Sequence, residues 1–213
     1  MHIFISGATG RNGRIVLDNA LARGHSVTVL ARDPSSSPLP SHLNLAQDVE
    51  KALTTPRPPN TIITTLNQRR ISENPFSALS PDSPPDLLAS TTKTLLAALT
   101  TLLQTSPPIF PRGTPPPPPP KKNHRQFPLR GPRIIAVKDH NDMDRSVRES
   151  GFAFVLARAA RLTDGPAREV RVWPDDGEGC GWNAAVGRES LGRWMVSAAE
   201  TDEWDGRAPV LTD

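Results

Sequence analysis

The 213-residue sequence contains no tyrosine and only one cysteine, Cys180. Without tyrosine, no mechanism can use a phenolic acid or base. A single cysteine excludes an intramolecular disulfide and a cysteine-rich zinc cluster, and it fits a reducing, cytoplasmic location. No apolar run approaches the roughly 20 residues of a membrane span, and the five histidines lie without metal-ligand spacing. We therefore expect no membrane partner and no metal site.

Proline, in contrast, is abundant: 21 of the 24 prolines lie between Pro34 and Pro132. Residues 105–132 centre on the run Pro115–Pro120, for which we expect polyproline II or disorder. The same region holds most of the excess basic charge, so the chain lacks the basic face expected of a nucleic-acid-binding domain. A run of prolines followed by lysines matches SH3-type ligands by chance, so we expect no nucleic-acid partner and no protein partner at this tract.

Apolar segments typical of strands alternate with segments of helical periodicity along the chain. The expected strands are 2–6, 26–30, 43–46, 61–66, 133–137 and 152–157, and the later expected helices cover about 84–104, 140–149 and 189–199. The apolar run 152–157 is typical of an inner parallel strand. This alternation predicts one α/β domain over residues 1–213, a Rossmann-like doubly wound parallel sheet with a proline-rich insertion at 105–132.

A glycine-rich loop follows the first expected strand. The three glycines have the spacing Gly7-x-x-Gly10-x-x-Gly13 and lead directly into a helical pattern. In such loops the first glycine allows a tight turn, the second lets a pyrophosphate approach the backbone, and the third lets helix and strand pack closely. The spacing predicts a dinucleotide site; the alternative is a turn that keeps its glycines for geometry alone. The predicted cofactor-binding residues of this loop are Gly7, Thr9, Gly10, Arg11, Asn12 and Gly13.

The residues after the second expected strand bear on the choice of cofactor. An acid at this position bonds the ribose of NAD, whereas a basic residue accommodates the 2′-phosphate of NADP. Here Arg32 comes first and Asp33 follows it, and Arg11 in the glycine loop can supply a second cation. The sequence favours NADP(H) over NAD(H). The alternative is that Arg32 is a solvated residue paired with Asp33.

These two segments, residues 7–13 and 27–33, resemble the atypical short-chain dehydrogenases of the NAD(P)H-binding, NmrA-like and biliverdin/flavin-reductase-like group. The resemblance covers about three quarters of the chain. It implies that Asp48 and Val49 cap the adenine and that Thr65 and Leu66 pass beside the cofactor. Residues 162–166 (Leu-Thr-Asp-Gly-Pro) are similar to the C-terminal half of that group.

The chain also departs from this group. Its well-known members use a Tyr-x-x-x-Lys pair, which a chain without tyrosine cannot form, although atypical members often lack it. Lys138 and His140 follow the expected fifth strand and are the candidate proton donors for a ketone-like acceptor. The alternative is that both are solvated side chains in the first turn of a helix, with Asp139 as the cap of that helix.

The resemblance implies an NADP(H)-dependent oxidoreductase that transfers hydride to a small acceptor, aromatic, quinone-like or flavin-like, in a tailoring step of secondary metabolism. Two other interpretations stay open: a non-catalytic NAD(P)-binding sensor of the NmrA-like kind, and a defective paralogue. Residues 105–132 allow three accounts, namely a natural insertion, a replaced substrate loop, or translated intron or shifted frame.

Overall fold

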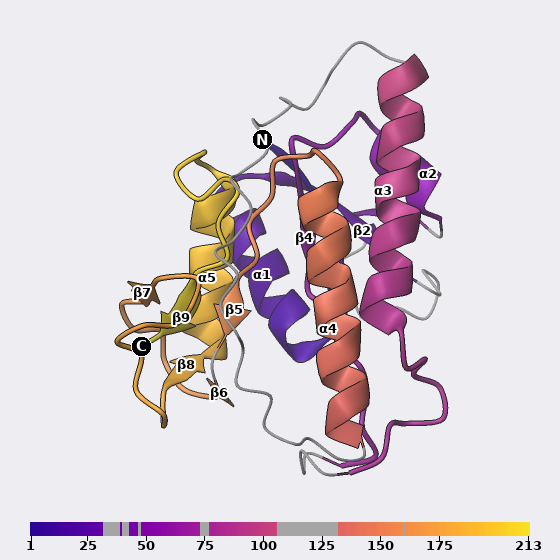
Figure 1. Ribbon diagram of the computed structural model, residues 1–213. Coiled ribbons are helices and arrows are strands. Elements are labelled where there is room, and N and C mark those ends of the chain that lie inside the picture. Colours follow the sequence, from indigo (N-terminus) through magenta and orange to yellow (C-terminus); the bar gives the residue numbers. More distant parts are fainter. Residues whose placement is uncertain (32–38, 40–42, 47, 73–76, 106–131, 160) are drawn as a thin grey trace.

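The computed structural model describes residues 1–31, 39, 43–46, 48–72, 77–105, 132–159 and 161–213 (Figure 1). The strands are β1 (His2–Ser6), β2 (Ser26–Leu30), β3 (Asn44–Ala46), β4 (Thr61–Thr64), β5 (Arg158–Ala159), β6 (Arg161–Thr163), β7 (Arg171–Trp173), β8 (Ala185–Gly187) and β9 (Val210–Thr212). The helices are α1 (Arg11–Ala22), α2 (Val49–Thr54), α3 (Leu87–Thr105), α4 (Pro132–Glu149) and α5 (Arg188–Ala199). The proline tract and Arg32 lie outside the described residues.

The first four strands form one parallel sheet in the order β3-β2-β1-β4. The register places Ile3 of β1 opposite Val27 of β2 and Thr61 of β4. The chain continues from β1 to β2 on one side and later returns to β4 on the other side of β1. In parallel sheets such a reversal of strand order leaves a crevice at the carboxyl ends of the strands, where ligands bind. The glycine loop begins at this end.

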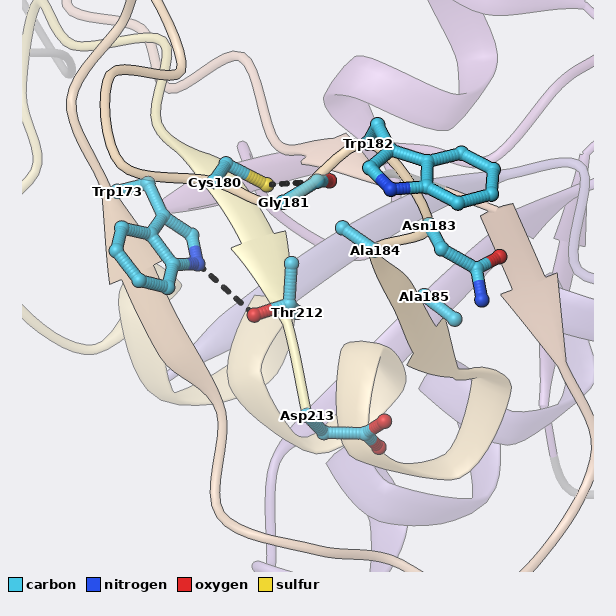
Figure 2. A pocket seen from close by; sticks show the side chains of 9 residues that line it. All are labelled: Trp173, Cys180, Gly181, Trp182, Asn183, Ala184, Ala185, Thr212 and Asp213. Atoms are coloured by element: carbon cyan, nitrogen blue, oxygen red, sulfur yellow. Dashed lines mark hydrogen bonds between the residues drawn. The ribbon is translucent and has the colours of Figure 1, made fainter.

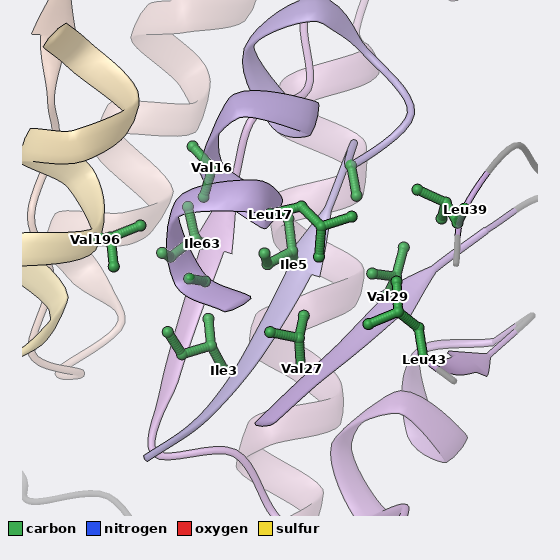
Figure 3. Close-up of a cluster of buried hydrophobic side chains, with 12 residues drawn as sticks. Ile3, Ile5, Val16, Leu17, Val27, Val29, Leu39, Leu43, Ile63 and Val196 are labelled. Atoms are coloured by element: carbon green, nitrogen blue, oxygen red, sulfur yellow. The ribbon is translucent and has the colours of Figure 1, made fainter. Parts of the chain in front are cut away.

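Helices cover both faces of this sheet, because side chains of a strand alternate between its faces. Ile3 and Ile5 of β1 pack with α1 and with Val196 of α5 (Figure 3). Phe4, between them, points to the opposite face and packs with Leu53 of α2 and Leu99 of α3. Figure 1 accordingly shows α1 and α5 on one side of the sheet and α3 on the other. The predicted Rossmann-like doubly wound α/β fold is confirmed.

Two expected strands are wrong. Residues 133–137 belong to α4, which begins at Pro132 and not near His140. Proline is favoured in the first turn of a helix, and the weak strand preference of the β-branched residues is overridden by the long helix that continues to Glu149.

Residues 152–157 do not join the parallel sheet either. Val155 forms only an isolated bridge with Arg207, and the neighbouring Leu156 N–H donates to the Arg207 carbonyl at 3.0 Å. The apolar side chains of this run instead connect two parts of the core: Phe152 packs in the cluster that contains Phe4, and Ala157 packs in the cluster that contains Leu211.

The last part of the chain forms two small sheets beside α5. One has the order β5-β9-β7 and the other pairs β6 with β8. Their core contains the buried residues Val186, Leu191 and Leu211. None of the described helices is both long enough and apolar enough to cross a membrane.

Candidate functional site

The glycine loop passes very close to the strand and helix that it connects. Gly7 has φ +86°, a backbone conformation that residues other than glycine rarely adopt. A Cβ atom at Gly13 would lie 2.0 Å from the Gly7 carbonyl oxygen, which is far inside van der Waals contact. The Gly10 N–H donates to the same oxygen at 3.0 Å. The first and third glycines are therefore required by the packing of the loop, as the spacing predicts.

Thr65, just after β4, completes the floor of this loop. Its Oγ1 donates to the Ser6 carbonyl at 3.1 Å, and its N–H donates to the same carbonyl at 3.0 Å. The same Oγ1 would lie 2.8 Å from a Cβ at Gly7 and 2.7 Å from one at Gly13. The structure thus places Thr65, with the Leu66 N–H beside it, directly against the loop.

The start of α1 presents groups that suit a phosphate. Gly10 is the N-cap and makes no side-chain capping bond, and the first turn holds no acidic residue. Thr9 and Gly10 are exposed. The side-chain Oδ1 of Asn12 is buried and has no hydrogen-bond partner within the described structure. An uncapped helix N-terminus attracts anions, and a ligand donor could satisfy the buried amide oxygen. The loop residues fit a dinucleotide.

Arg11 extends from this loop toward the last part of the chain. Its Nη2 lies 2.7 Å from Oδ2 of Asp164, and Oδ1 of Asp164 lies 2.8 Å from Nη1 of Arg188. The predicted role of Arg11 beside a 2′-phosphate stays a prediction, as does that of Arg32.

Asp48 and Val49 have structural roles at the start of α2. Asp48 is the N-cap of this helix, and its carboxylate accepts the Lys51 N–H at 2.7 Å. Val49 packs in the cluster between the sheet and α3. Asp48 also borders a cavity of about 420 Å³ between α2 and α3, lined in addition by Leu102. The predicted position of Asp48 and Val49 beside the adenine stays a prediction.

Lys138 and His140 lie within α4. Lys138 is exposed and forms an ion pair with Asp142, one turn further along. Desolvation by the surrounding protein lowers the pKa of His140, and the charge of the neighbouring Asp139 opposes this effect. A lowered pKa favours the neutral imidazole, which suits a proton acceptor better than a proton donor. Like Lys138, His140 is exposed on this helix. The role of both residues as proton donors stays a prediction.

The interpretation of Asp139 as the cap of its own helix is wrong. This residue lies inside α4 with 2% exposure, and its carboxylate accepts the N–H groups of Leu88 and Ala89 at 3.0 and 2.8 Å. It therefore caps the first turn of α3. Gln68, which sequence reasoning missed, donates to the same carboxylate from Nε2 at 2.8 Å.

A second cavity, of about 390 Å³, lies in the last part of the chain. Figure 2 shows Trp173 and Trp182 on opposite sides of it, with Thr212 between them. Trp173 Nε1 donates to Thr212 Oγ1 at 2.9 Å, whereas Trp182 is 99% exposed. Cys180, in the loop between the two indoles, is half-buried. Among the described residues, no group of three His, Cys, Asp or Glu side chains could hold a metal ion.

Comparison with known proteins supports the fold. No protein-family model matches the sequence. The structure is similar over 100% of this chain to the oxidoreductase YlbE from Lactococcus lactis, with 14% identity, 91% of that chain covered and a TM-score of 0.68. It is similar over 100% of its length to the anaerobillin reductase ChuY from Escherichia coli, with 13% identity, 97% of that chain covered and a TM-score of 0.66.

A third similar structure is a Rossmann-fold NAD(P)-binding family protein from Shigella flexneri. The match covers 100% of this chain and 93% of that chain, at 14% identity and a TM-score of 0.65. These neighbours agree with the resemblance to atypical short-chain dehydrogenases in the sequence. The described part of the chain therefore has the Rossmann fold of these NAD(P)-binding and oxidoreductase structures.

Proposed function

We propose that this protein is an NADP(H)-dependent oxidoreductase that transfers hydride to a small conjugated acceptor. The glycine loop at the carboxyl end of β1 supports the cofactor, and the similar structures include an oxidoreductase and an anaerobillin reductase. The single observation that carries the proposal is the start of α1. Its N-cap, Gly10, has no side chain to bind the first N–H groups, and the buried Oδ1 of Asn12 has no partner among the described residues.

The residues of the loop have distinct roles in this proposal. Gly7 and Gly13 bring β1 and α1 close enough that backbone N–H groups at the start of α1 can bind a pyrophosphate. Thr65 holds the loop against the end of β4 through its two bonds to Ser6. Asn12 provides an acceptor for a ligand hydroxyl or amide. Asp48 and Val49 are proposed to lie beside the adenine.

The bound nicotinamide would supply the hydride, and the chain would orient the acceptor and keep water away from it. Reduction of a ketone also needs a proton from the protein for the developing oxyanion. Lys138 and His140 both remain candidates for this proton: Lys138 is held by Asp142, and the lowered pKa of His140 disfavours its protonated form. In the absence of tyrosine, an acceptor that takes its proton from solvent, such as a flavin or quinone, suits the chain best.

The preference for NADP(H) rests on the order Arg32-Asp33 after β2. A guanidinium at this position favours the extra phosphate, and an Arg32→Ala variant is expected to lose affinity for NADPH far more than for NADH. An equal loss for both cofactors would remove the role in phosphate binding. The single cysteine suits a cytoplasmic location for this chemistry.

The absence of tyrosine also favours a second candidate, an NAD(P)-binding sensor without catalysis. Consumption of NADPH separates the two. We expect the purified protein to oxidise NADPH in the presence of a quinone or a flavin, and the Gly10→Val variant to lose this activity with its fold intact. Tight binding of NADPH without consumption by any acceptor would instead identify the sensor.

A further inference from the structure

Asp164 joins the N-terminal ends of two helices that are far apart in the sequence. Arg11 is the first residue of α1 and Arg188 is the first residue of α5. The Asp164 carboxylate uses a separate oxygen for each of them: Oδ2 lies 2.7 Å from Arg11 Nη2, and Oδ1 lies 2.8 Å from Arg188 Nη1. Either bond can therefore open while the other stays closed.

The two arginines differ in how firmly the fold holds them. The Arg188 side chain is 18% exposed, whereas that of Arg11 is 57% exposed and that of Asp164 is 68% exposed. A largely exposed ion pair contributes at most about 1 kcal/mol, since water solvates both charges well. The bond between Arg11 and Asp164 is therefore the exchangeable one, and Arg188 is the anchor of the carboxylate.

We propose that Asp164 sets the affinity for the cofactor by competing with its phosphates for Arg11. This inference rests on the proposed function, because a dinucleotide would bring its pyrophosphate to the start of α1, directly beside Arg11. Arginine binds phosphate through short charge-assisted bonds, often two at a time. Binding then moves the Arg11 guanidinium from Asp164 to a phosphate of the cofactor, either the pyrophosphate or the 2′-phosphate, and leaves Asp164 with Arg188.

The negative charge of Asp164 also weakens the binding of an anionic cofactor. It reduces the positive potential at the start of α1, where the helix itself attracts anions. Removing the carboxylate takes this anionic partner away from Arg11 and leaves two adjacent cations, Arg11 and Arg188, beside the site. The chain thus contains an internal anion that keeps cofactor binding weaker than its glycine loop alone would allow.

The test is calorimetric titration of NADPH into the intact protein and its variants at low and high salt. We expect Asp164→Asn and Asp164→Ser to bind NADPH about two- to fivefold more tightly than the wild type, the range of one exposed ion pair. High salt should shrink the gain, because it screens exposed charges. Arg188→Gln should weaken binding, since Asp164 then pairs with Arg11 alone, and this loss should disappear when Asp164→Asn is added.

The matched control is Asp18→Asn. It also removes one negative charge, here from α1 itself, where Asp18 pairs with Arg14 at 3.2 Å, about two turns from Arg11. We expect its affinity for NADPH to equal that of the wild type. Equal or weaker binding by both Asp164 variants, with a wild type that binds, would overturn this inference alone. A wild type that does not bind NADPH would overturn the proposed function and this inference together.

Discussion

The carboxylate of Asp139 accepts a hydrogen bond from Nε2 of Gln68 at 2.8 Å, in the buried space between α4 and the start of α3. The amide of Gln68 can point in one way only, because its other neighbour, the Pro85 carbonyl at 2.6 Å, is also an acceptor. Its Oε1 is buried and has no partner among the described residues. The segment after β4, the start of α3 and the middle of α4 therefore meet at one carboxylate.

Removing this carboxylate should destabilise the fold. Asp139→Ala leaves the N–H groups of Leu88 and Ala89 buried without an acceptor, so we expect a loss of about 2–4 kcal/mol in the free energy of unfolding. Urea unfolding measures this loss. The control is Asp142→Ala in the same helix. The Asp142 side chain is 25% exposed and pairs with the exposed Lys138; we expect this variant to lose less than about 1 kcal/mol. Similar losses in both variants would contradict the capping role of Asp139.

The glycine loop predicts an order of effects on stability. A Cβ at Gly13 would lie 2.0 Å from the Gly7 carbonyl oxygen, whereas one at Gly10 would lie 3.3 Å from it. We expect Gly13→Ala to cost at least about 2 kcal/mol of stability and Gly10→Ala less than about 1 kcal/mol. Thermal and urea unfolding of the two variants would show the difference. Equal stability of the two would mean that the loop is not packed as described.

Stability should fall as the pH decreases from about 7 to about 5, because of His2. This side chain is fully buried, and its Nε2 lies 2.9 Å from the Thr28 hydroxyl. Burial lowers its pKa below the ordinary value of 6.5, although the backbone carbonyls of Pro58 and Arg57 partly oppose the shift. The unfolded chain therefore takes up the proton first, and acid favours unfolding.

The His2→Gln variant keeps a donor for Thr28 but does not titrate. Urea unfolding across this pH range should show a smaller pH dependence for the variant than for the wild type. A slope unchanged by the substitution would show that His2 does not cause it.

A second pH effect should appear in stronger acid, at Asp144. Burial raises the pKa of this carboxyl, but hydrogen bonds from Arg148 and Arg158 outweigh burial and hold the pKa below its ordinary value of 3.8. Its stabilising contribution is present above this ordinary value and is lost as the pH falls through the lowered one. Asp144→Asn should be less stable at neutral pH, and this deficit should shrink in acid. A deficit that is constant with pH would contradict the ion-pair role.

Two tryptophans of the last part of the chain, Trp182 and Trp194, should differ sharply in their contribution to the free energy of unfolding. Trp194 packs against the core around Val186 and lies 5.4 Å from the ring of Trp204, centroid to centroid. We expect Trp194→Ala to lose about 2–3 kcal/mol of stability and Trp182→Ala to change it by no more than about 0.5 kcal/mol. Urea unfolding tests both. A large loss in Trp182→Ala would mean that this indole is packed and not exposed.

Local signals predict the first βαβ unit well. The bounds of β1 and β2 agree with the expected strands. Both strands are short apolar runs rich in β-branched residues, and the glycines that bound the helix between them lie nearby in the sequence. The segment 133–137 carries the same type of local signal and forms a helix instead. Whether such a run becomes a strand depends on a sheet edge that can receive it, and no local pattern contains that information.

The contacts that sequence reasoning missed join distant residues. Asp139 caps a helix that begins about 50 positions earlier, and Arg11 meets Asp164 from the other end of the chain. Asp139 is recognisable as a capping residue, but its sequence position points to the wrong helix. Long-range pairs of this kind are set by the packing of whole elements, so only the folded structure shows them.

The central claim is that the start of α1 binds NADP(H), and calorimetric titration of the wild type and of Gly10→Val tests it most directly. We predict that the wild type binds NADPH more tightly than NADH. The variant should bind neither, because its side chain occupies the path of the pyrophosphate, and it should still unfold cooperatively. Equal binding by the folded variant, or no binding of either cofactor by the wild type, would contradict the account.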